Sequence, residues 1–426
     1  MSTETPKRPS SLSRRQFLHT AAAATAAATV SSRAHAQSKP DVLRVGVIGC
    51  GGRGNGHMKT LRYIHDNDKS VDIVAVCDTY RPRGMKAAEA QNAKYYMDHR
   101  ELLADPKIDA VFIATPDHIH GYQAMDAVKA GKDVYCEKPV THWRQFELTK
   151  ELAKTVKESG RVFQLGSQGM SDPAWREMRK LVQDGLIGQP IHAECGYFRV
   201  GDWGERGMPI DDPNAKPGPD LNWEAFLGDS PKRDFDVSRY FRWRMYEDYA
   251  GGPSTDLFPH SLTPTLFILG LTMPSMAVAA GGKWRYQERE VPDTFNMLID
   301  YPEQVTIAVL GTQGNDYQNT NGGRGAGGRI PVVRGWEGTI TVDGQEIVFT
   351  PADESKKQAQ RFPFEGTEDM VAYFKHFLDC CRKRETETWS TMEHAYHVQT
   401  ALQMGTLALR ESKVAKFDKE KETIVL

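Results

Sequence analysis

Three glycines have the spacing that a phosphate-binding turn requires. Gly49, Gly51 and Gly54 form the pattern G-x-G-x-x-G directly after an apolar run that begins at Val42. Gly49 permits a tight turn, Gly51 removes a Cβ that would block a pyrophosphate, and Gly54 lets a helix pack closely on a strand. The N-terminus of that helix would offer N–H groups to phosphate. The predicted dinucleotide contacts of this motif are Gly49, Gly51, Gly52, Arg53 and Gly54.

The next apolar run, residues 71–78, ends in an acid. Asp78 could accept a hydrogen bond from the 2′-hydroxyl of an adenosine ribose and would repel a 2′-phosphate, which favours NAD. Arg81 and Arg83 follow and could neutralise such a phosphate, so NADP stays open. The alternative is a glycine-rich loop that binds no nucleotide, but the order of strand, turn, helix and acid favours a nucleotide site.

Asp256 and His260 are candidates for acid–base chemistry. They are four residues apart, so on one helix they would share a face. A carboxylate beside an imidazole fixes its tautomer and raises its basicity, as a general base that takes a proton from an alcohol requires. The structural alternative is an Asp that caps a helix ahead of a buried histidine. The two residues by themselves leave both interpretations open.

Other chemistries have weaker support. His118 and His120 follow Asp117, but no third ligand lies at a metal-binding spacing, so we predict no metal site. The sequence has no G-x-S-x-G nucleophile elbow and no Walker loop. Five side chains could line a sugar site, although packing and solvated surface explain them equally well: Arg199, Trp223, Arg242, Trp243 and Arg244.

Apolar runs alternate with helical stretches over residues 43–165, which is typical of a parallel sheet with crossover helices. Ligands of such sheets bind beyond the carboxyl ends of the strands. One predicted strand leads into TPDHIH, residues 115–120, and the next leads into EKP, residues 137–139. Pro139 keeps Lys138 out of the helical region, so the lysine side chain can be aimed from a rigid strand end. A solvated loop lysine is the alternative.

The glycine motif, TPDHIH and CEKPV together resemble the glucose-fructose oxidoreductase, inositol dehydrogenase and MocA family (Gfo/Idh/MocA). In that family the Thr-Pro loop lies over the cofactor, and the lysine of the Glu-Lys-Pro motif touches both the nicotinamide ribose and the substrate. Asp117 stands here where the family usually has Asn. The resemblance implies cofactor contacts from Thr115, Pro116, His120, Glu137 and Lys138.

The same resemblance favours a functional role for the acid–histidine pair. The family has an Asp-x-x-x-His pair after a glycine cluster, and here the pair follows Gly251 and Gly252. We therefore predict that the catalytic residues are Lys138, Asp256 and His260.

The pattern changes after residue 165. Segments 276–286, 294–301, 306–312 and 338–342 are predicted strands, consistent with an open sheet, and residues 369–412 form a predicted helical region. The stretch at 201–220 is too long for a connector and predicts a surface loop near the site.

The predicted architecture is an α/β fold with two domains. A Rossmann dinucleotide-binding domain covers residues 41–165. An α+β domain with a large open, mostly antiparallel sheet covers residues 166–426 and, by the resemblance, holds the substrate and often oligomerises. The C-terminal helices are candidates for packing back on the first domain. We expect a homo-oligomer, either a dimer or a tetramer.

The first 36 residues predict a leader. Arg14 and Arg15, an Ala/Thr-rich run and a small-x-small site ending at Ala36 are typical of a Tat export signal cleaved after that residue. The predicted location is the periplasm or another compartment outside the cytoplasm. The formal net charge is −2 and becomes more negative without the basic leader, which favours neither nucleic acid nor an anionic membrane as a partner.

These observations predict an exported oxidoreductase that moves hydride between tightly bound NAD, or NADP, and a carbinol carbon of a sugar or polyol. Two other functions stay open. Bound NAD could oxidise one carbinol transiently so that a neighbouring glycosidic bond is eliminated. Water would then add and the hydride would return, which would make the protein a glycoside hydrolase. Alternatively, the dinucleotide could be a structural element or a sensed ligand in a non-catalytic protein.

Overall fold

The computed structural model describes residues 41–202, 204–316 and 330–426. The predicted leader, its cleavage site after Ala36 and the Gly/Asn-rich residues 317–329 lie outside the described residues. Within the described residues, no helix is both long and apolar enough to cross a membrane.

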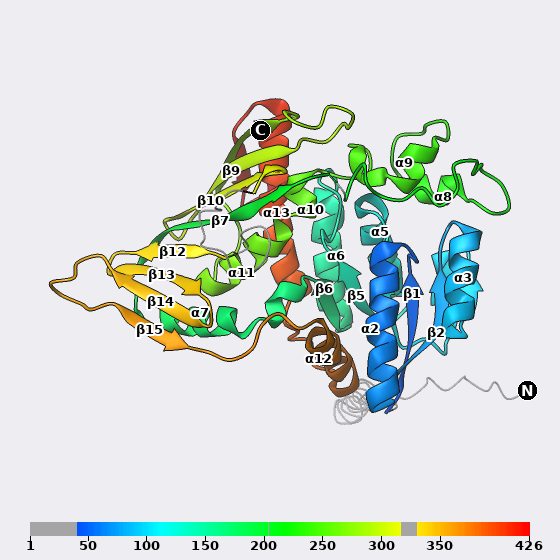
Figure 1. The fold of residues 1–426 in the computed structure, drawn as a ribbon, viewed down its shortest axis with the longest axis horizontal. Coiled ribbons are helices and arrows are strands. Elements are labelled where there is room, and N and C mark those ends of the chain that lie inside the picture. The colour runs from blue at the N-terminus through cyan, green and yellow to red at the C-terminus, as the bar shows by residue number, and fades with distance from the viewer. Residues whose placement is uncertain (1–40, 203, 317–329) are drawn as a thin grey trace, which may run out of the picture. The chain divides into compact units, whose positions relative to one another are not determined.

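A parallel sheet organises the first domain (Figure 1). In the described residues it has 6 strands in the order β3-β2-β1-β4-β5-β6, and every neighbouring pair is parallel. The direction of winding changes between β1 and β4, which is where doubly wound sheets bind ligands. The strands are β1 (Leu43–Ile48), β2 (Val71–Cys77), β3 (Lys94–Tyr96), β4 (Ala110–Ile113), β5 (Asp133–Glu137) and β6 (Phe163–Gly166). The predicted Rossmann fold is confirmed.

Crossover helices join these strands, which is why β1, β4 and β5 are buried on both faces. The helices are α2 (Gly52–Asp68), α3 (Arg81–Gln91), α4 (His99–Leu103), α5 (Asp117–Lys129) and α6 (Phe146–Ser159).

A large, mostly antiparallel sheet forms the second domain, as predicted. The described residues contribute 11 strands in the order β15-β14-β13-β12-β7-β10-β9-β8-β16-β17, with β11 paired to β7. The long strand β7 pairs in parallel with β10, whereas β12 and β11 pair antiparallel to it. The strands are β7 (Pro190–Val200), β8 (Met276–Gly282), β9 (Thr294–Tyr301), β10 (Val305–Thr312), β11 (Gly314–Asn315), β12 (Val332–Gly335), β13 (Gly338–Asp343), β14 (Glu346–Pro351), β15 (Gln360–Pro363), β16 (Ala415–Asp418) and β17 (Thr423–Val425).

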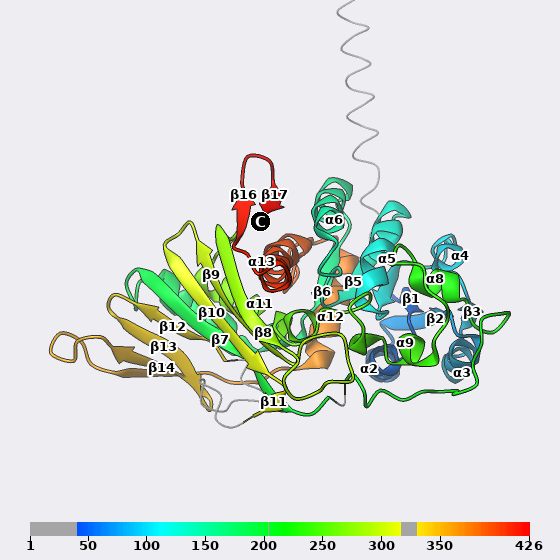
Figure 2. The same ribbon diagram turned by 90° about the horizontal axis from the view of Figure 1, so that it is seen from above.

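Helices α7 (Pro173–Gln183), α11 (Pro259–Leu269) and α13 (Met392–Glu411) pack against this sheet, which curves around α11 and α13 in Figure 2. Apolar side chains of α11 and α13 share a buried core with β9 and β10. Short helices lie in the connection between β7 and α11: α8 (Trp223–Leu227), α9 (Val237–Phe241) and α10 (Pro253–Asp256).

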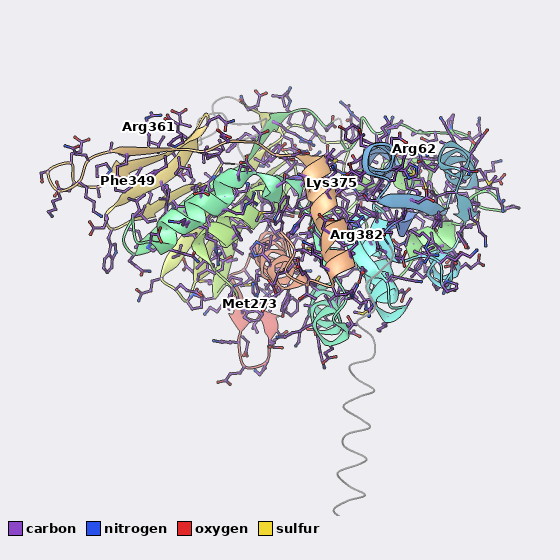
Figure 3. All side chains as sticks on the ribbon, turned by 90° about the horizontal axis from the view of Figure 1, so that it is seen from below. Arg62, Met273, Phe349, Arg361, Lys375 and Arg382 are labelled. Carbon is purple, nitrogen blue, oxygen red and sulfur yellow. The ribbon has the colours of Figure 1, made fainter. Side chains whose placement is uncertain are left out.

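Helix α12 (Met370–Lys383) packs against the first domain, beside α2 (Figure 3). The Lys375 ammonium lies 2.7 Å from the Asp68 carboxylate, and the Arg382 guanidinium donates to the Ser70 carbonyl at 2.6 Å. On the inner side, Phe374 joins the buried core that includes β4 and β5. A C-terminal helix therefore completes the core of the N-terminal domain.

Two predicted elements have different bounds in the structure. The strand expected at 276–286 ends at Gly282, because the Asp293 carboxylate accepts the next main-chain N–H groups and turns the chain. The helical region expected at 369–412 is two helices, because Arg384 has φ 60° and ends α12.

Candidate active site

A cavity of about 1240 Å³ lies beyond the carboxyl ends of the first domain's strands and is also lined by residues of the second domain. This volume exceeds the ~300–1,000 Å³ usual for one small ligand, so it has room for a dinucleotide and a substrate. The predicted site residues that line it are Gly49, Gly51, Gly52, Arg53, Asp78, Thr115, Pro116, Glu137, Lys138, Asp256 and His260. Gly54 and His120 are the predicted site residues that do not line the cavity.

The glycine motif forms a cradle that side chains would fill. Gly49 has φ +92°, which favours glycine. A Cβ on Gly54 would lie 1.8 Å from the Gly49 carbonyl oxygen, so α2 can approach β1 only with glycine there. At Gly51 the atom nearest to an added Cβ is an Arg83 nitrogen at 4.0 Å, so the position faces open space. These residues fit a pyrophosphate at the N-terminus of α2.

Asp78 braces this cradle. Its carboxylate accepts the main-chain N–H of Cys50 and that of Tyr80, each at 2.9 Å. An Arg83 nitrogen lies 3.9 Å from the same carboxylate. Asp78 therefore couples the end of β2 to the glycine turn, in the place expected for the residue that meets the adenosine ribose.

His120 joins the loop that follows β4 to the loop that follows β5. One ring nitrogen lies 3.1 Å from the Thr115 carbonyl oxygen, and the other is hydrogen-bonded to the Pro139 carbonyl. Burial lowers the pKa of His120 to about 4, so the ring is neutral at pH 7 and donates to one carbonyl at a time. His118 donates to the Phe226 carbonyl at 2.6 Å. The rings of His118 and His120 therefore both form hydrogen bonds with main-chain carbonyl groups.

Glu137 is a buried carboxylate at the end of β5. His57 and Gln168 lie within 2.8 Å and 2.7 Å of one oxygen, and Arg53 lies 3.6 Å from the other. Burial by itself would raise the pKa of Glu137, but Arg53 and His57 hold it well below its usual value. Glu137 therefore stays charged and fixes Arg53 on the cavity wall.

Lys138 and Asp256 connect the two domains at the cavity. The Lys138 ammonium donates to the Asp256 main-chain oxygen at 2.6 Å and lies 3.3 Å from its carboxylate. Arg244 donates to the same carboxylate at 3.2 Å, and Arg199 lies 3.9 Å from it. Burial by itself would raise the pKa of Asp256, but these three cations hold it well below its usual value. Burial lowers the pKa of Lys138, although Asp256 opposes that shift.

The expectation that Asp256 and His260 share a face of one helix is wrong. Asp256 ends α10, and His260 is the second residue of α11. Pro259 has no N–H with which to extend the first helix, so a new helix begins there. Both side chains nevertheless line the cavity, and the charge of Asp256 acts on His260. The carboxylate is held by Lys138 and Arg244, not by a helix N-terminus.

Asp117 adds a carboxyl to the part of the cavity that Lys138 and Asp256 line. It is the first residue of α5, and its side chain is hydrogen-bonded to Thr255. Burial raises its pKa to about 7, although Arg244 and Lys138 oppose the shift. Asp117 can therefore gain or lose a proton near neutral pH.

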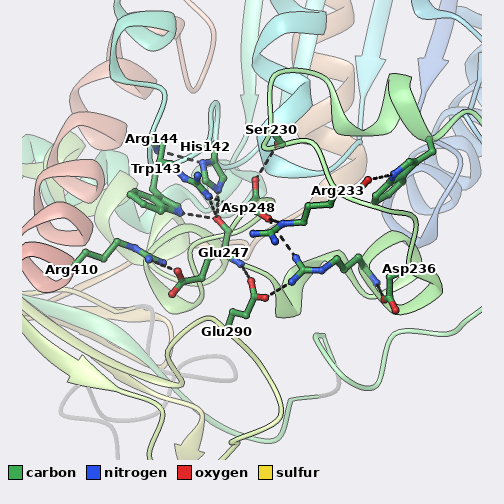
Figure 4. Close-up of polar contacts among 12 residues, drawn as sticks. His142, Trp143, Arg144, Ser230, Arg233, Asp236, Glu247, Asp248, Glu290 and Arg410 are labelled. Atoms are coloured by element: carbon green, nitrogen blue, oxygen red, sulfur yellow. Dashed lines mark hydrogen bonds and ion pairs between the residues drawn. The ribbon is translucent and has the colours of Figure 1, made fainter.

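An ionic cluster outside the cavity fixes the segment that carries Arg244 (Figure 4). The Asp248 carboxylate accepts from Arg144 at 3.2 Å, and the Glu247 main-chain oxygen accepts from Arg144 at 2.8 Å and from His142 at 3.1 Å. His142 and Arg144 follow the EKP loop directly. The cluster thus ties the segment before α10 to the loop that carries Lys138.

Two residues that support Glu137, namely His57 and Gln168, are not among those predicted from the sequence. His57 is fully buried, and its ring packs edge-on against Phe112 and Tyr135. Its position three residues after Gly54 on one helix places it on the face that meets the sheet, which was a usable signal. Gln168 follows β6 and had no comparable signal.

Comparison with known proteins gives three family matches. Residues 11–31 match the twin-arginine translocation pathway signal sequence. Residues 43–167 match a family described as an oxidoreductase family with an NAD-binding Rossmann fold. Residues 172–426 match an oxidoreductase family described by its C-terminal alpha/beta domain.

Curated relatives cover part of the chain. It is 35% identical over 155 residues to inositol 2-dehydrogenase 1 of Saccharopolyspora erythraea, a match that covers 36% of this chain and 45% of that protein. It is 32% identical over 199 residues to scyllo-inositol 2-dehydrogenase (NAD(+)) of Bacillus subtilis, covering 46% of this chain and 53% of that protein. The chain thus spans about half the length of these relatives.

Solved structures share the fold over nearly the whole chain. Levoglucosan dehydrogenase in complex with NADH and levoglucosan has a TM-score of 0.64 at 19% identity, over 90% of this chain and 99% of that chain. The WlbA dehydrogenase from Bordetella pertussis, in complex with NADH and UDP-GlcNAcA, has a TM-score of 0.64 at 18% identity, over 88% of this chain and 99% of that chain.

Proposed function

Because the chain belongs to the Gfo/Idh/MocA oxidoreductase family, which its two domains both match, we propose that it transfers hydride between tightly bound NAD and a carbinol carbon of a sugar or polyol. The observation that carries this proposal is that Lys138, Asp256 and His260 line the same cavity as the glycine cradle. The cradle, Asp78 and the Thr115–Pro116 wall would hold the dinucleotide, and the nicotinamide supplies the hydride acceptor when bound.

In this proposal His260 is the general base. It takes the hydroxyl proton as the carbinol carbon loses its hydride. The ammonium of Lys138 hydrogen-bonds the same oxygen and stabilises its developing negative charge. Asp256 positions that ammonium through the contacts described above, and its negative charge acts on His260.

The substrate class rests on the relatives and the cavity together. The curated relatives are inositol dehydrogenases, and one structural neighbour was solved with levoglucosan. Polar and charged side chains at the catalytic end of the cavity, among them Arg199, Arg244 and Gln168, suit the hydroxyl groups of such molecules. Inositols and anhydrosugars are therefore the first substrates to test.

Location, processing and assembly are parts of the same proposal. The match to a twin-arginine signal supports export. We further propose cleavage after Ala36, a periplasmic location, domains covering residues 41–165 and 166–426, and a homo-oligomer.

A second candidate is an NAD-dependent glycoside hydrolase, and Asp117 favours it. In such an elimination a base removes the C–H proton next to the oxidised carbon, the glycosidic C–O bond on the following carbon breaks, and the leaving oxygen needs a proton donor; water then adds and the hydride returns. Asp117 lines the cavity, and a buried carboxyl with a pKa of about 7 is protonated in part of the molecules at neutral pH, so it could supply that proton.

One assay separates these functions. The purified protein is incubated with inositols, free sugars and aryl glycosides while nicotinamide absorbance and release of the aryl alcohol are followed together. Net reduction of NAD without aryl alcohol release supports the oxidoreductase. Sustained aryl alcohol release without net reduction supports the hydrolase, and no response to any of these compounds contradicts both.

A further inference from the structure

A segment of the second domain is hydrogen-bonded to the residues that follow Asp78, at the end of the cavity where the proposed function places the adenosine ribose. We call residues 208–222 the strap. The main-chain N–H of Arg81 donates to the Asp220 carbonyl at 2.8 Å, and the N–H of Asn222 donates to the Thr79 carbonyl at 2.9 Å. The helices that follow the strap, α8 and α9, lie at the same end of the first sheet in Figures 1 and 2. The strap thus lies beside the residues that follow β2.

Arg83 is a cation of the cavity lining in this region, as is Lys86, and the strap engages Arg83. Two nitrogens of its guanidinium lie 2.9 Å and 2.8 Å from one carboxylate oxygen of Asp211, a strap residue. A third nitrogen lies 3.9 Å from Asp78. The guanidinium also lies 5.8 Å from the Tyr80 ring centroid and 5.5 Å from that of Phe241. Two carboxylates and two aromatic rings therefore fix its orientation.

This arrangement opposes recognition of a 2′-phosphate. An arginine binds phosphate by directing two N–H groups at its oxygens, but here two nitrogens of Arg83 are directed at Asp211. A phosphate that approached Arg83 would also meet the negative charges of Asp78 and Asp211. Asp211 lines the cavity, and its side chain is partly exposed. Its negative charge therefore acts on a ligand inside the cavity.

We propose that Asp211 is a specificity-determining residue for the cofactor: by engaging Arg83 from the second domain, it excludes NADP in favour of NAD. This inference rests on the proposed function, because it needs a dinucleotide in the cavity. Asp211 would select the cofactor together with Asp78, although it lies more than one hundred positions later in the chain.

Asp211→Asn keeps the shape of the side chain and removes its charge. Arg83 is then able to direct its N–H groups at a phosphate, and the repulsion is reduced. We expect the ratio of NADP to NAD in the purified full chain to rise about 10-fold or more, the scale of one charge-assisted contact. The ratio is measured by denaturing the protein and identifying the released dinucleotide by mass spectrometry, without any sugar substrate.

Two variants control this experiment. Asp220→Asn removes a charge from the same strap, but its partner is Arg81 at 3.4 Å, and neither Arg81 nor Asp220 lines the cavity. We expect it to keep the wild-type ratio. The double variant Arg83→Ala with Asp211→Asn should lose the gain in NADP, because the phosphate-binding group is gone.

An unchanged ratio in Asp211→Asn, with normal dinucleotide content, would overturn the role of Asp211 and leave the proposed function standing. An equal rise in Asp220→Asn would also overturn it, because net charge would then explain the effect. A wild-type protein that releases neither dinucleotide would contradict the proposed function itself.

Discussion

The ammonium of Lys138, in the first domain, donates a 2.6 Å hydrogen bond to the main-chain oxygen of Asp256, in the second. The same ammonium lies 3.3 Å from the Asp256 carboxylate. The residue that would stabilise the reacting oxygen is therefore positioned by the other domain. Asp256→Asn keeps the main-chain contact, so it should act on Lys138 through the lost charge of the carboxylate.

We expect Lys138→Met and Asp256→Asn each to slow hydride transfer on the order of 10²-fold, the scale for loss of oxyanion stabilisation. The double variant should be little slower than the slower single variant, because both changes disable one unit. Rapid-mixing reduction of bound cofactor measures these rates. Fully multiplicative effects would contradict the coupling.

His260→Ala should slow hydride transfer on the order of 10²-fold or more, because it removes the general base. Its dinucleotide content should match the wild type, since the cradle lies on the first domain. His192→Ala is a suitable control: this histidine lies on β7 beside Arg334 and does not line the cavity. Wild-type rates in His260→Ala would show that another group takes the proton.

Asp117 should make stability depend on pH. Its pKa is about 7 in the folded chain, against about 3.9 for an unfolded aspartate. Between these values the folded state binds more protons, so the free energy of unfolding should fall as pH rises from about 4 to about 7. Asp117→Asn should lack this fall. The free energy of unfolding of the variant minus that of the wild type should therefore increase between pH 5 and pH 8.

Urea unfolding at pH 5 and pH 8, on samples with equal dinucleotide content, tests the Asp117 prediction. Asp66→Asn is the matched control, because Asp66 is an exposed carboxylate with a side chain that is 56% accessible. Identical pH dependence in Asp117→Asn and the wild type would show that Asp117 titrates normally.

Cofactor retention follows from export. Twin-arginine signals direct folded proteins across the membrane, and NAD is scarce outside the cytoplasm, so the dinucleotide should be bound before export. Denaturing the exported protein should release about one dinucleotide per chain, because a ligand that binds the folded state tightly stays with it. Fully active exported protein without bound dinucleotide, and without added cofactor, would contradict this.

The parts of the fold that local patterns control were predictable. The glycine motif, Asp78 and the strand ends at Thr115 and Glu137 lie where the sequence placed them, because apolar strand periodicity and parallel-sheet topology set these positions. The bounds of the second sheet were less accurate. The strand β8 ends where the carboxylate of Asp293, which lies outside the predicted strand, accepts main-chain N–H groups. The local preference of residues 276–286 for a strand does not indicate such a contact.

The sequence predicted that Lys138, Asp256 and His260 lie at one site, and all three line the cavity. It did not predict that Pro259 divides the segment into two helices, or that the Asp256 carboxylate contacts Lys138 and Arg244. These contacts come from residues far away in the sequence, so the spacing of Asp256 and His260 could not indicate them. His120 was expected at the cofactor, but its ring nitrogens face two backbone carbonyls behind the wall.

Helix α12 sets an order of events during synthesis. Its Phe374 ring lies 5.3 Å from the ring of His57, and His57 is hydrogen-bonded to Glu137 at the cavity wall. A ribosome must therefore translate the chain past residue 374 before the core behind this wall is complete. A nascent chain that ends before α12 would lack the aromatic ring that packs on His57.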